Sequence, residues 1–110
     1  MKIYNSLKNE LEEFKPIEDG KVTMYVCGPT VYNYVHIGNM RPVITFDMVY
    51  KYLKYKGYEV KYASNFTDIN PKIISAAKEL GITEREVADK FIKAYLEDVA
   101  SYNCTDIDYR

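Results

Sequence analysis

The sequence predicts an α/β protein with a parallel sheet, built as a strand–helix–strand unit followed by two more helices. Two segments with apolar residues at every second position predict the strands, and apolar residues three and four apart between them predict the connecting helix. Glycines, prolines and capping residues fall at the boundaries of these segments. Strands joined by one helix lie parallel with a right-handed crossover, which is a topology that nucleotide-binding proteins use.

Length and composition limit the chain to one globular domain, residues 1–110. Of its 110 residues 47% are hydrophobic and 28% charged. No apolar run approaches the roughly 18 residues that a membrane span needs. The N-terminus lacks the apolar core of a secretory signal, so we expect a cytoplasmic protein with no membrane partner. The net charge of −1 argues neither for nor against an RNA partner.

Two residue types stand out in the composition. The two cysteines, Cys27 and Cys104, lie far apart in a chain that we expect to be cytosolic, which favours free thiols or a ligand role over a disulfide. The twelve tyrosines are interpreted as residues at the edge of the core, because tyrosine joins an apolar ring to a hydroxyl that stays hydrated. A platform for stacking nucleic-acid bases is the alternative.

The first predicted strand covers residues 22–27 and follows a turn at Gly20. Its apolar residues alternate, and Tyr25 and Cys27 on the second face are also fairly apolar. We therefore expect both faces of this strand to be covered, as in a parallel sheet.

A helix is predicted from about residue 39 to residue 56. Pro42 falls in its first turn, where a missing N–H costs little, and Gly57 suits the position after its end. Asp47 is expected on the hydrated side together with two lysines. The apolar face consists of Val43, Phe46, Val49, Tyr50 and Leu53.

The second strand is predicted at residues 58–64 and a second helix at residues 71–80, after the capping residue Asn70 and before Gly81. Thr83 and Glu86 have the spacing of a capping box and predict the start of a third helix. Its buried stripe is expected to consist of Val87, Phe91, Tyr95, Val99 and Tyr102.

A candidate nucleotide site lies where the first strand ends and the first long helix begins. Ligands of open α/β sheets bind beyond the carboxyl ends of the strands, which is where Cys27 falls. His36, Gly38 and Asn39 precede or open the helix, whose unpaired amides favour a phosphate. The plain structural interpretation is that His36 caps the helix and Cys27 packs as a small apolar residue, and from the residues alone both interpretations stay open.

Residues 24–39, MYVCGPTVYNYVHIGN, resemble the opening of the catalytic domain of cysteinyl-tRNA synthetase, a class I aminoacyl-tRNA synthetase. Residues 65–69 (NFTDI) are similar to the same family, as are residues 2–5, 13–17 and 98–110, so the resemblance covers essentially the entire chain. It implies the first half of a Rossmann-like nucleotide-binding fold, marked by a His-Ile-Gly-Asn signature, and a single, partial catalytic domain.

The resemblance also implies roles for particular residues. Cys27 corresponds to a zinc ligand, and the metal of that family binds the thiolate of the substrate cysteine. His36 and Asn39 correspond to catalytic residues that stabilise the phosphates of ATP. The implied reaction forms cysteinyl-adenylate from cysteine and ATP, releases pyrophosphate and transfers cysteine to tRNA. The implied ATP-binding residues are His36, Ile37, Gly38 and Asn39, and the implied substrate-binding residues are Cys27, Gly28, Thr30 and Thr67.

The sequence departs from the family pattern in two ways. Asn70 and Pro71 stand where the family typically has two acids. The other zinc ligands, the lysine-bearing loop that holds pyrophosphate and the anticodon-binding helices would all lie beyond Arg110. We therefore expect the 110-residue chain to be an inactive fragment with an incomplete zinc site and an unpaired sheet edge through which copies self-associate.

Two alternative functions remain beside the cysteine–tRNA ligase. The first is the related ligase that joins cysteine to an amino sugar, which is similar over this part of the chain. The second is a module that binds a nucleotide or a partner without chemistry, which the missing acids at Asn70 and Pro71 favour. Cysteine-dependent ATP–pyrophosphate exchange would separate the enzymes from the module.

Overall fold

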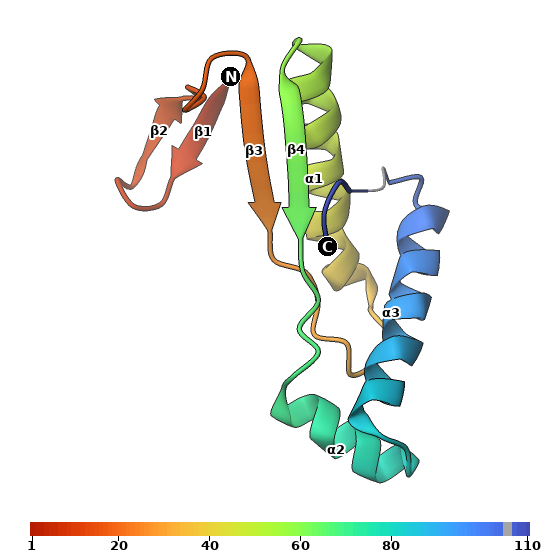
Figure 1. Ribbon diagram of the computed structural model, residues 1–110. Coiled ribbons are helices and arrows are strands. Elements are labelled where there is room, and N and C mark those ends of the chain that lie inside the picture. Colours follow the sequence, from red (N-terminus) through yellow and green to blue (C-terminus); the bar gives the residue numbers. More distant parts are fainter. Residues whose placement is uncertain (105–106) are drawn as a thin grey trace.

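The computed structural model describes residues 1–104 and 107–110. In chain order the elements are β1 (Lys2–Asn5), β2 (Glu10–Glu13), β3 (Lys21–Val26), α1 (Ile37–Tyr55), β4 (Glu59–Ser64), α2 (Pro71–Leu80) and α3 (Glu84–Ser101). β3 and β4 lie side by side with α1 against them, and α2 lies at the N-terminal end of α3 (Figure 1). The predicted order of strand, helix, strand and two helices is confirmed.

β3, α1 and β4 form the predicted parallel unit. The two strands pair in parallel from Lys21 opposite Glu59 to Val26 opposite Ser64. The inner face of this sheet packs on α1, because its apolar residues alternate as a strand requires and those of α1 recur with the helical period. The buried residues of this cluster are Val22, Tyr50, Leu53, Val60 and Tyr62.

The expected cover on both faces of β3 is wrong. Tyr25 is 60% exposed, and the Cys27 side chain is also exposed, one residue beyond the end of the strand. Tyr25 belongs to the face of β3 that is turned away from α1, and no helix lies over that face in the part of the chain that the structure describes (Figure 1). A moderately apolar side chain such as that of tyrosine or cysteine can be buried or exposed. Its presence in a strand therefore does not show that another element covers that face.

Two side chains on the long helices also differ from expectation. Asp47 is only 8% exposed, because α1 turns this side toward the loop after α3: Lys51 Nζ lies 2.6 Å from Asp47 Oδ2 and donates to the carbonyl oxygen of Asn103 at 3.3 Å. Tyr102 is 46% exposed because α3 ends at Ser101, so this tyrosine caps the helix and leaves its buried stripe. A charged pair thus connects α1 to the end of α3.

The helices α2 and α3 begin and end as the sequence predicts. Asn70 Oδ1 accepts from the backbone N–H of Lys72 at 3.0 Å, and Gly81 ends α2 with a positive φ of 66°. Thr83 and Glu86 form the predicted reciprocal cap of α3. The two helices share a core centred on Ile73, Val87 and Phe91 with Val31 from the segment after β3.

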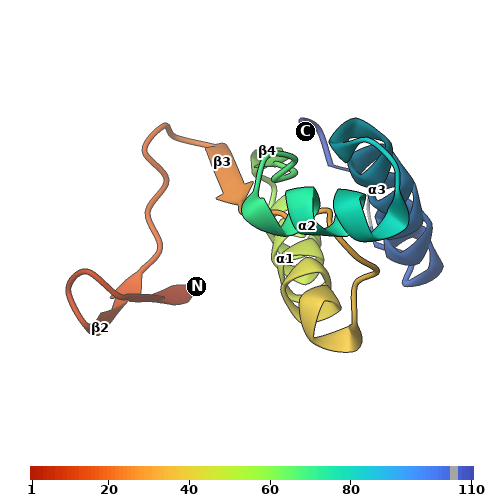
Figure 2. The ribbon, with the colours of Figure 1, turned by 90° about the horizontal axis from the view of Figure 1, so that it is seen from below.

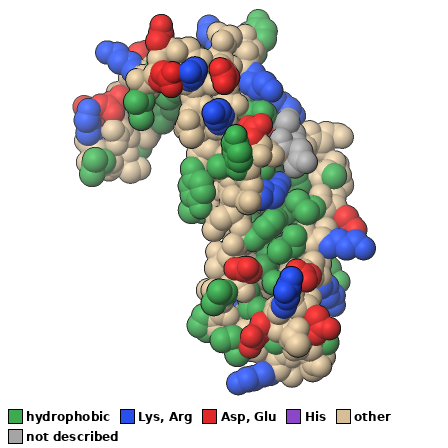
Figure 3. All heavy atoms as spheres, viewed as in Figure 1, with side chains coloured by type: hydrophobic (Ala, Val, Ile, Leu, Met, Phe, Trp, Pro, Cys, Tyr) green, Lys and Arg blue, Asp and Glu red, His purple; other side chains and the backbone are tan. Residues whose placement is uncertain are grey.

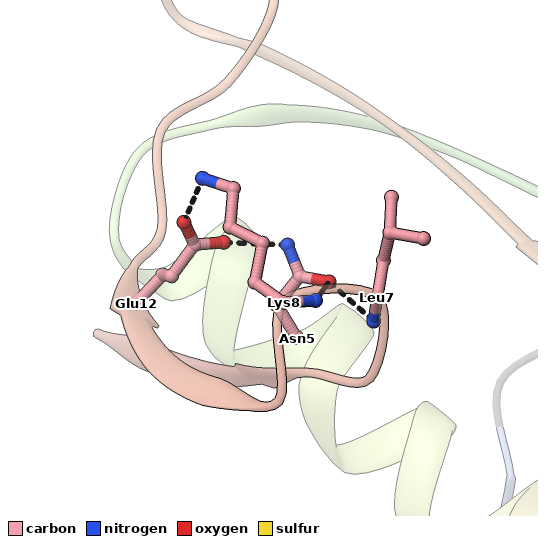
Figure 4. A network of polar contacts seen from close by, with 4 residues as sticks. All are labelled: Asn5, Leu7, Lys8 and Glu12. Carbon is pink, nitrogen blue, oxygen red and sulfur yellow. Dashed lines mark hydrogen bonds and ion pairs between the residues drawn. The ribbon is translucent and has the colours of Figure 1, made fainter.

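A hairpin of β1 and β2 was not expected from the polar N-terminal segment. It stands apart from the other elements, to which residues 14–20 connect it (Figure 2). Glu12 holds its turn region by contacts with Lys8 and Asn5, and the Asn5 side chain also accepts from the backbone N–H of Leu7 at 2.9 Å (Figure 4). The lysine first, and then the asparagine, lowers the pKa of the Glu12 carboxyl.

The C-terminal residues lie along the outer edge of β4. The backbone N–H of Ser64 donates to the carbonyl oxygen of Tyr109 at 3.0 Å, and Asp108 N–H donates to Tyr62 O at 3.0 Å. Arg110 then lies over the rings of Phe66 and Tyr95, 5.3 and 5.8 Å from their centroids. This segment therefore connects the sheet to α3.

The molecule is extended, with a radius of gyration of 16.6 Å. A compact domain of this length would have a radius of about 13 Å. Its apolar residues form three small clusters, between the sheet and α1, between α1 and α3, and between α2 and α3. On the face drawn in Figure 3, hydrophobic side chains gather between β4 and α3. No helix among residues 1–104 and 107–110 is long and apolar enough to cross a membrane.

Candidate nucleotide site

The end of β3 is fixed by a close crossing of two backbones. Gly28 N–H donates to Asn65 Oδ1 at 2.8 Å, and a Cβ added at Gly28 would lie 1.7 Å from the Asn65 carbonyl oxygen. Only glycine fits there, because every other residue would place a carbon inside that oxygen. Two residues further on, Thr30 and Thr67 form a parallel bridge, with Val31 N–H donating to Thr67 O at 3.2 Å.

The start of α1 is held by a reciprocal cap. His36 Nδ1 accepts from the backbone N–H of Gly38 at 3.1 Å, and Asn39 Oδ1 accepts from the backbone N–H of His36 at 3.0 Å. A neutral imidazole that accepts at Nδ1 carries its proton on Nε2, so it presents an N–H donor on the side away from the cap. The exposed amide of Asn39 likewise keeps its NH₂ group for donation.

The first turn of α1 contains no acidic residue. Its N-terminal amides and the helix dipole therefore give this end a positive potential without a carboxylate to offset it. Gly38 contributes by its small size, since a Cβ there would lie 2.9 Å from His36 Cε1 and displace the ring. The cap and the charge together suit an anion at this end of the helix.

A cleft of about 180 Å³ separates the strand end from the helix start. We call it the strand-end cleft. It brings together four of the predicted site residues, Cys27 and Gly28 from one side and Gly38 and Asn39 from the other. Its remaining lining residues are Val26, Pro29, Pro42, Val43, Tyr62, Ser64 and Tyr95.

The other predicted site residues lie around this cleft without lining it. His36 holds the cap beside Gly38, and Ile37 is 79% exposed on the first turn. Thr30 and Thr67 face each other across their bridge, one step beyond the Gly28 crossing. The structure thus brings Cys27 to the α1 start, and it holds the two threonines in a neighbouring pair.

Two tyrosines of the cleft were not found from the sequence. Burial raises the pKa of the Tyr62 and Tyr95 hydroxyls, with Arg110 opposing this shift at both. The two groups therefore stay protonated near neutral pH and are neutral donors beside the cleft. Tyr95 comes from α3, nearly sixty positions from Asn39, so no local pattern could have placed it in this site.

The residues around Cys27 do not form a zinc site. Structural and catalytic zinc sites take three or four protein ligands. Within residues 1–104 and 107–110 no group of three or more His, Cys, Asp and Glu side chains is close enough to hold a metal ion. Both cysteines are free, as the sequence predicts. Among the described residues Cys27 is therefore not part of a full set of zinc ligands.

A family model described as tRNA synthetases class I (C) catalytic domain matches residues 13–110, which include both sides of the strand-end cleft. The chain belongs to this synthetase family. The matched part begins within β2, and it contains the complete β3–α1–β4 unit and the two following helices. The structure has an α/β fold with one parallel strand pair. This agrees with the Rossmann-like fold expected for a class I catalytic domain.

Individual relatives share the same name. Cysteine--tRNA ligase of Bacillus licheniformis is 62% identical over 106 residues, which are 96% of this chain and 23% of that protein. The ligase of Listeria monocytogenes serotype 4a is 60% identical over 103 residues, 94% of this chain and 22% of that protein. The ligase of Lachnoclostridium phytofermentans is 54% identical over all 110 residues and 23% of its own length. The chain thus spans about a quarter of the curated relatives that it matches.

Proposed function

We propose that this chain is the nucleotide-binding first part of a cysteine–tRNA ligase catalytic domain, in which ATP activates cysteine before its transfer to tRNA. The observation that carries the proposal is the strand-end cleft, where a helix start without acidic residues faces the end of β3. Residues 1–110 form one partial domain of that enzyme, whose expected location is the cytoplasm. The high identity to named ligases supports the choice of cysteine and tRNA as substrates.

In the proposed reaction, a carboxylate oxygen of cysteine forms a bond to the α-phosphorus of ATP. The bond from that phosphorus to the bridging oxygen breaks, and pyrophosphate leaves with the electron pair. Negative charge grows on the phosphate oxygens, so neutral donors fixed beforehand favour the transition state. His36 Nε2–H and the side-chain amide of Asn39 are these donors, and the dipole of α1 adds to them. Gly28, Thr30 and Thr67 shape the cysteine pocket, with Cys27 at its edge.

ATP binding measured by calorimetry tests the site. We expect the 110-residue chain to bind ATP weakly, at millimolar concentration or above, because it holds only part of the family's phosphate contacts. His36→Ala with Asn39→Ala should reduce that affinity at least about tenfold, since hydrogen bonds to a charged group are lost. Thr83→Ala, which removes the cap of α3 instead, is the matched control and should leave it unchanged. Millimolar or tighter binding that survives the double substitution would contradict the site.

Cysteine-dependent ATP–pyrophosphate exchange tests the enzyme assignment. The intact ligase that carries this segment should catalyse exchange, and the same double substitution should reduce it at least about a hundredfold, as is typical for removal of transition-state donors. The isolated chain should give no exchange. Nucleotide binding without any exchange by the intact protein would favour the binding module, which the loss of two acids at Asn70 and Pro71 also favours.

Zinc content tests the role of Cys27. A single thiolate binds zinc weakly, so the desalted 110-residue chain should hold well below one zinc per molecule by atomic absorption. Cys27→Ser should leave this low content unchanged in the chain and lower it in the intact ligase. Stoichiometric zinc in the isolated chain would show that another donor, such as a second copy of the chain, completes the site.

A further inference from the structure

A second and larger cavity, of about 600 Å³, lies between the segment after β3 and the helices α2 and α3. We call it the tyrosine–lysine groove. It shares no lining residue with the strand-end cleft. Its chemically distinctive lining residues are Tyr32, Tyr34, Lys72, Glu79, Lys90 and Phe91.

Two lysines lie over aromatic rings at the rim of this groove. Lys72 Nζ is 5.1 Å from the centroid of the Tyr32 ring, and Lys90 Nζ is 5.9 Å from that of Tyr34. Tyr34 is 62% exposed and is held edge-on against Phe91, with centroids 5.1 Å apart. A fixed ring beside an ammonium group offers a stacking surface for a base and a charge for the adjoining phosphate.

The charges of this groove are local, because the chain as a whole carries a net charge of −1. Two lysines face one acid, Glu79, in the tyrosine–lysine groove. A second groove on the same helix pair, of about 520 Å³, has the opposite balance, since Asp68, Glu84 and Asp89 face Arg85. The α2–α3 pair therefore separates its charges, and of these two grooves the tyrosine–lysine groove has the surplus of positive charge and the tyrosine rings.

One segment of the chain borders both the cleft and the groove. Residues 27–29 line the strand-end cleft, and a few positions later residues 32–34 line the groove. Figure 1 shows this segment running from the end of β3 to the level of α2 and α3 before it turns back into α1. The groove and the cleft are therefore neighbours along this segment, which Val31 anchors in the core between α2 and α3.

We propose that the tyrosine–lysine groove binds single-stranded RNA, with bases against Tyr32 and Tyr34 and phosphates at Lys72 and Lys90. The choice of RNA rests on the proposed function, in which the acceptor of cysteine is a tRNA. Clefts of this volume hold ligands of nucleotide size, so the groove takes one or two nucleotides of the strand.

The test is fluorescence anisotropy of a labelled single-stranded hexaribonucleotide with the 110-residue chain, over a range of salt concentrations. Lys72→Ala with Lys90→Ala should weaken binding at least about tenfold and reduce the slope of log K against log salt by about 1.4, for two phosphate contacts at about 0.7 each. Tyr32→Leu keeps apolar contact, removes the ring face, and should weaken binding about fivefold or more, as a lost stacking contact does.

Lys78→Ala with Lys93→Ala is the matched control. It removes two positive charges from the same helices, and neither lysine lines the groove. Binding within twofold of wild type supports the groove, whereas equal losses in the two lysine pairs would show unspecific attraction and overturn it. The proposal also fails if the chain binds no hexamer at low salt, or if AMP competes as tightly as the hexamer. Circular dichroism verifies that every variant is folded.

Failure of this proposal can be told apart from failure of the proposed function. The pair His36→Ala and Asn39→Ala should weaken ATP binding at least about tenfold and leave hexamer binding unchanged. The pair Lys72→Ala and Lys90→Ala should weaken hexamer binding by a similar factor and leave ATP binding unchanged. If the first pair weakens ATP binding but RNA binding does not depend on Lys72 and Lys90, the proposal for the groove fails and that for the cleft stands. If RNA binding depends on the two lysines but ATP binding does not depend on His36 and Asn39, the proposal for the cleft fails and that for the groove stands.

Discussion

The helices α1 and α3 begin with the same kind of reciprocal cap and differ in the charge of their first turns. At α3, Thr83 and Glu86 bond each other's backbone N–H groups, and Glu84 and Glu86 place two carboxylates at the positive end of the dipole. At α1 the cap is built from His36 and Asn39, and the first turn has no acid. The two helix starts thus have the same kind of cap and differ in the charge of their first turns. Of the two, the α1 start suits an anionic ligand.

The surroundings of the two helix starts differ as well. The α1 start faces the end of β3 across the strand-end cleft. The α3 start follows α2 after a short turn at Gly81 and Ile82, and no strand end faces it among the described residues, although the cap residues are exposed at both starts. A cap by itself therefore does not indicate a ligand site. The lack of acids in the first turn and a strand end opposite the helix start are the features that separate the two.

The largest effect is expected from breaking the backbone crossing that fixes the end of β3. Gly28→Ala places a Cβ 1.7 Å from the Asn65 carbonyl oxygen, so two backbones must separate. The free energy of unfolding should fall by about 3 kcal/mol or more in urea denaturation, at the upper end of overpacking. The same methyl group in Gly38→Ala meets only the His36 ring, at 2.9 Å, and should change stability by less than about 1 kcal/mol. Equal effects of the two substitutions would contradict the crossing.

A smaller effect is expected at the α3 cap. Thr83→Ala removes the hydroxyl that accepts from Glu86 N–H at 3.2 Å. The loss of this N-cap should reduce the free energy of unfolding by about 1 kcal/mol. Thr45→Ala, at an exposed position inside α1, is the control and should be neutral or slightly stabilising, because alanine favours a helix interior more than threonine does. If thermal and urea unfolding do not distinguish the two variants, α3 does not depend on its cap.

The smallest effect is expected from the pH dependence at Glu86. The Thr83 backbone N–H first, and its side chain next, lowers the pKa of the Glu86 carboxyl below its ordinary value. A carboxyl with a lowered folded pKa stabilises the protein above its unfolded pKa, and this contribution is lost as the pH falls through the folded pKa. Glu86→Gln should therefore reduce stability at pH 7 and bring it closer to wild type at pH 3, measured by urea midpoints. A difference in urea midpoint between Glu86→Gln and wild type that stays the same at every pH would contradict a stabilising role of the Glu86 carboxylate.

Most of the fold could be predicted because its signals are local. The boundaries of α2, the cap of α3 and the parallel β3–α1–β4 unit follow from capping residues and periodicity within a few positions. The burial of Asp47 could not be predicted, because its cover comes from a loop more than fifty positions later. The β1–β2 hairpin is held by polar side chains of Asn5 and Glu12, which carry no alternating apolar pattern.

Part of the geometry of the candidate site could also be predicted. Cys27, Gly28, Gly38 and Asn39 meet because consecutive elements of a parallel unit place a strand end beside the following helix start. Tyr95 joins them from α3, and the tyrosine–lysine groove combines residues from three segments. Such long-range neighbours depend on the packing angle of α3 against α1, which no local sequence pattern sets.

The C-terminal segment that hydrogen-bonds to β4 has a consequence for how this sheet is extended. The backbone of residues 108–109 occupies the outer side of β4 at Tyr62 and Ser64, whereas no further strand pairs with the outer side of β3 among the described residues. A strand added beside β3, from elsewhere in a longer polypeptide or from a second copy, would find unpaired backbone groups there. It would lie beside the strand that ends next to Cys27, so widening the sheet on this side would also change the surroundings of that thiol.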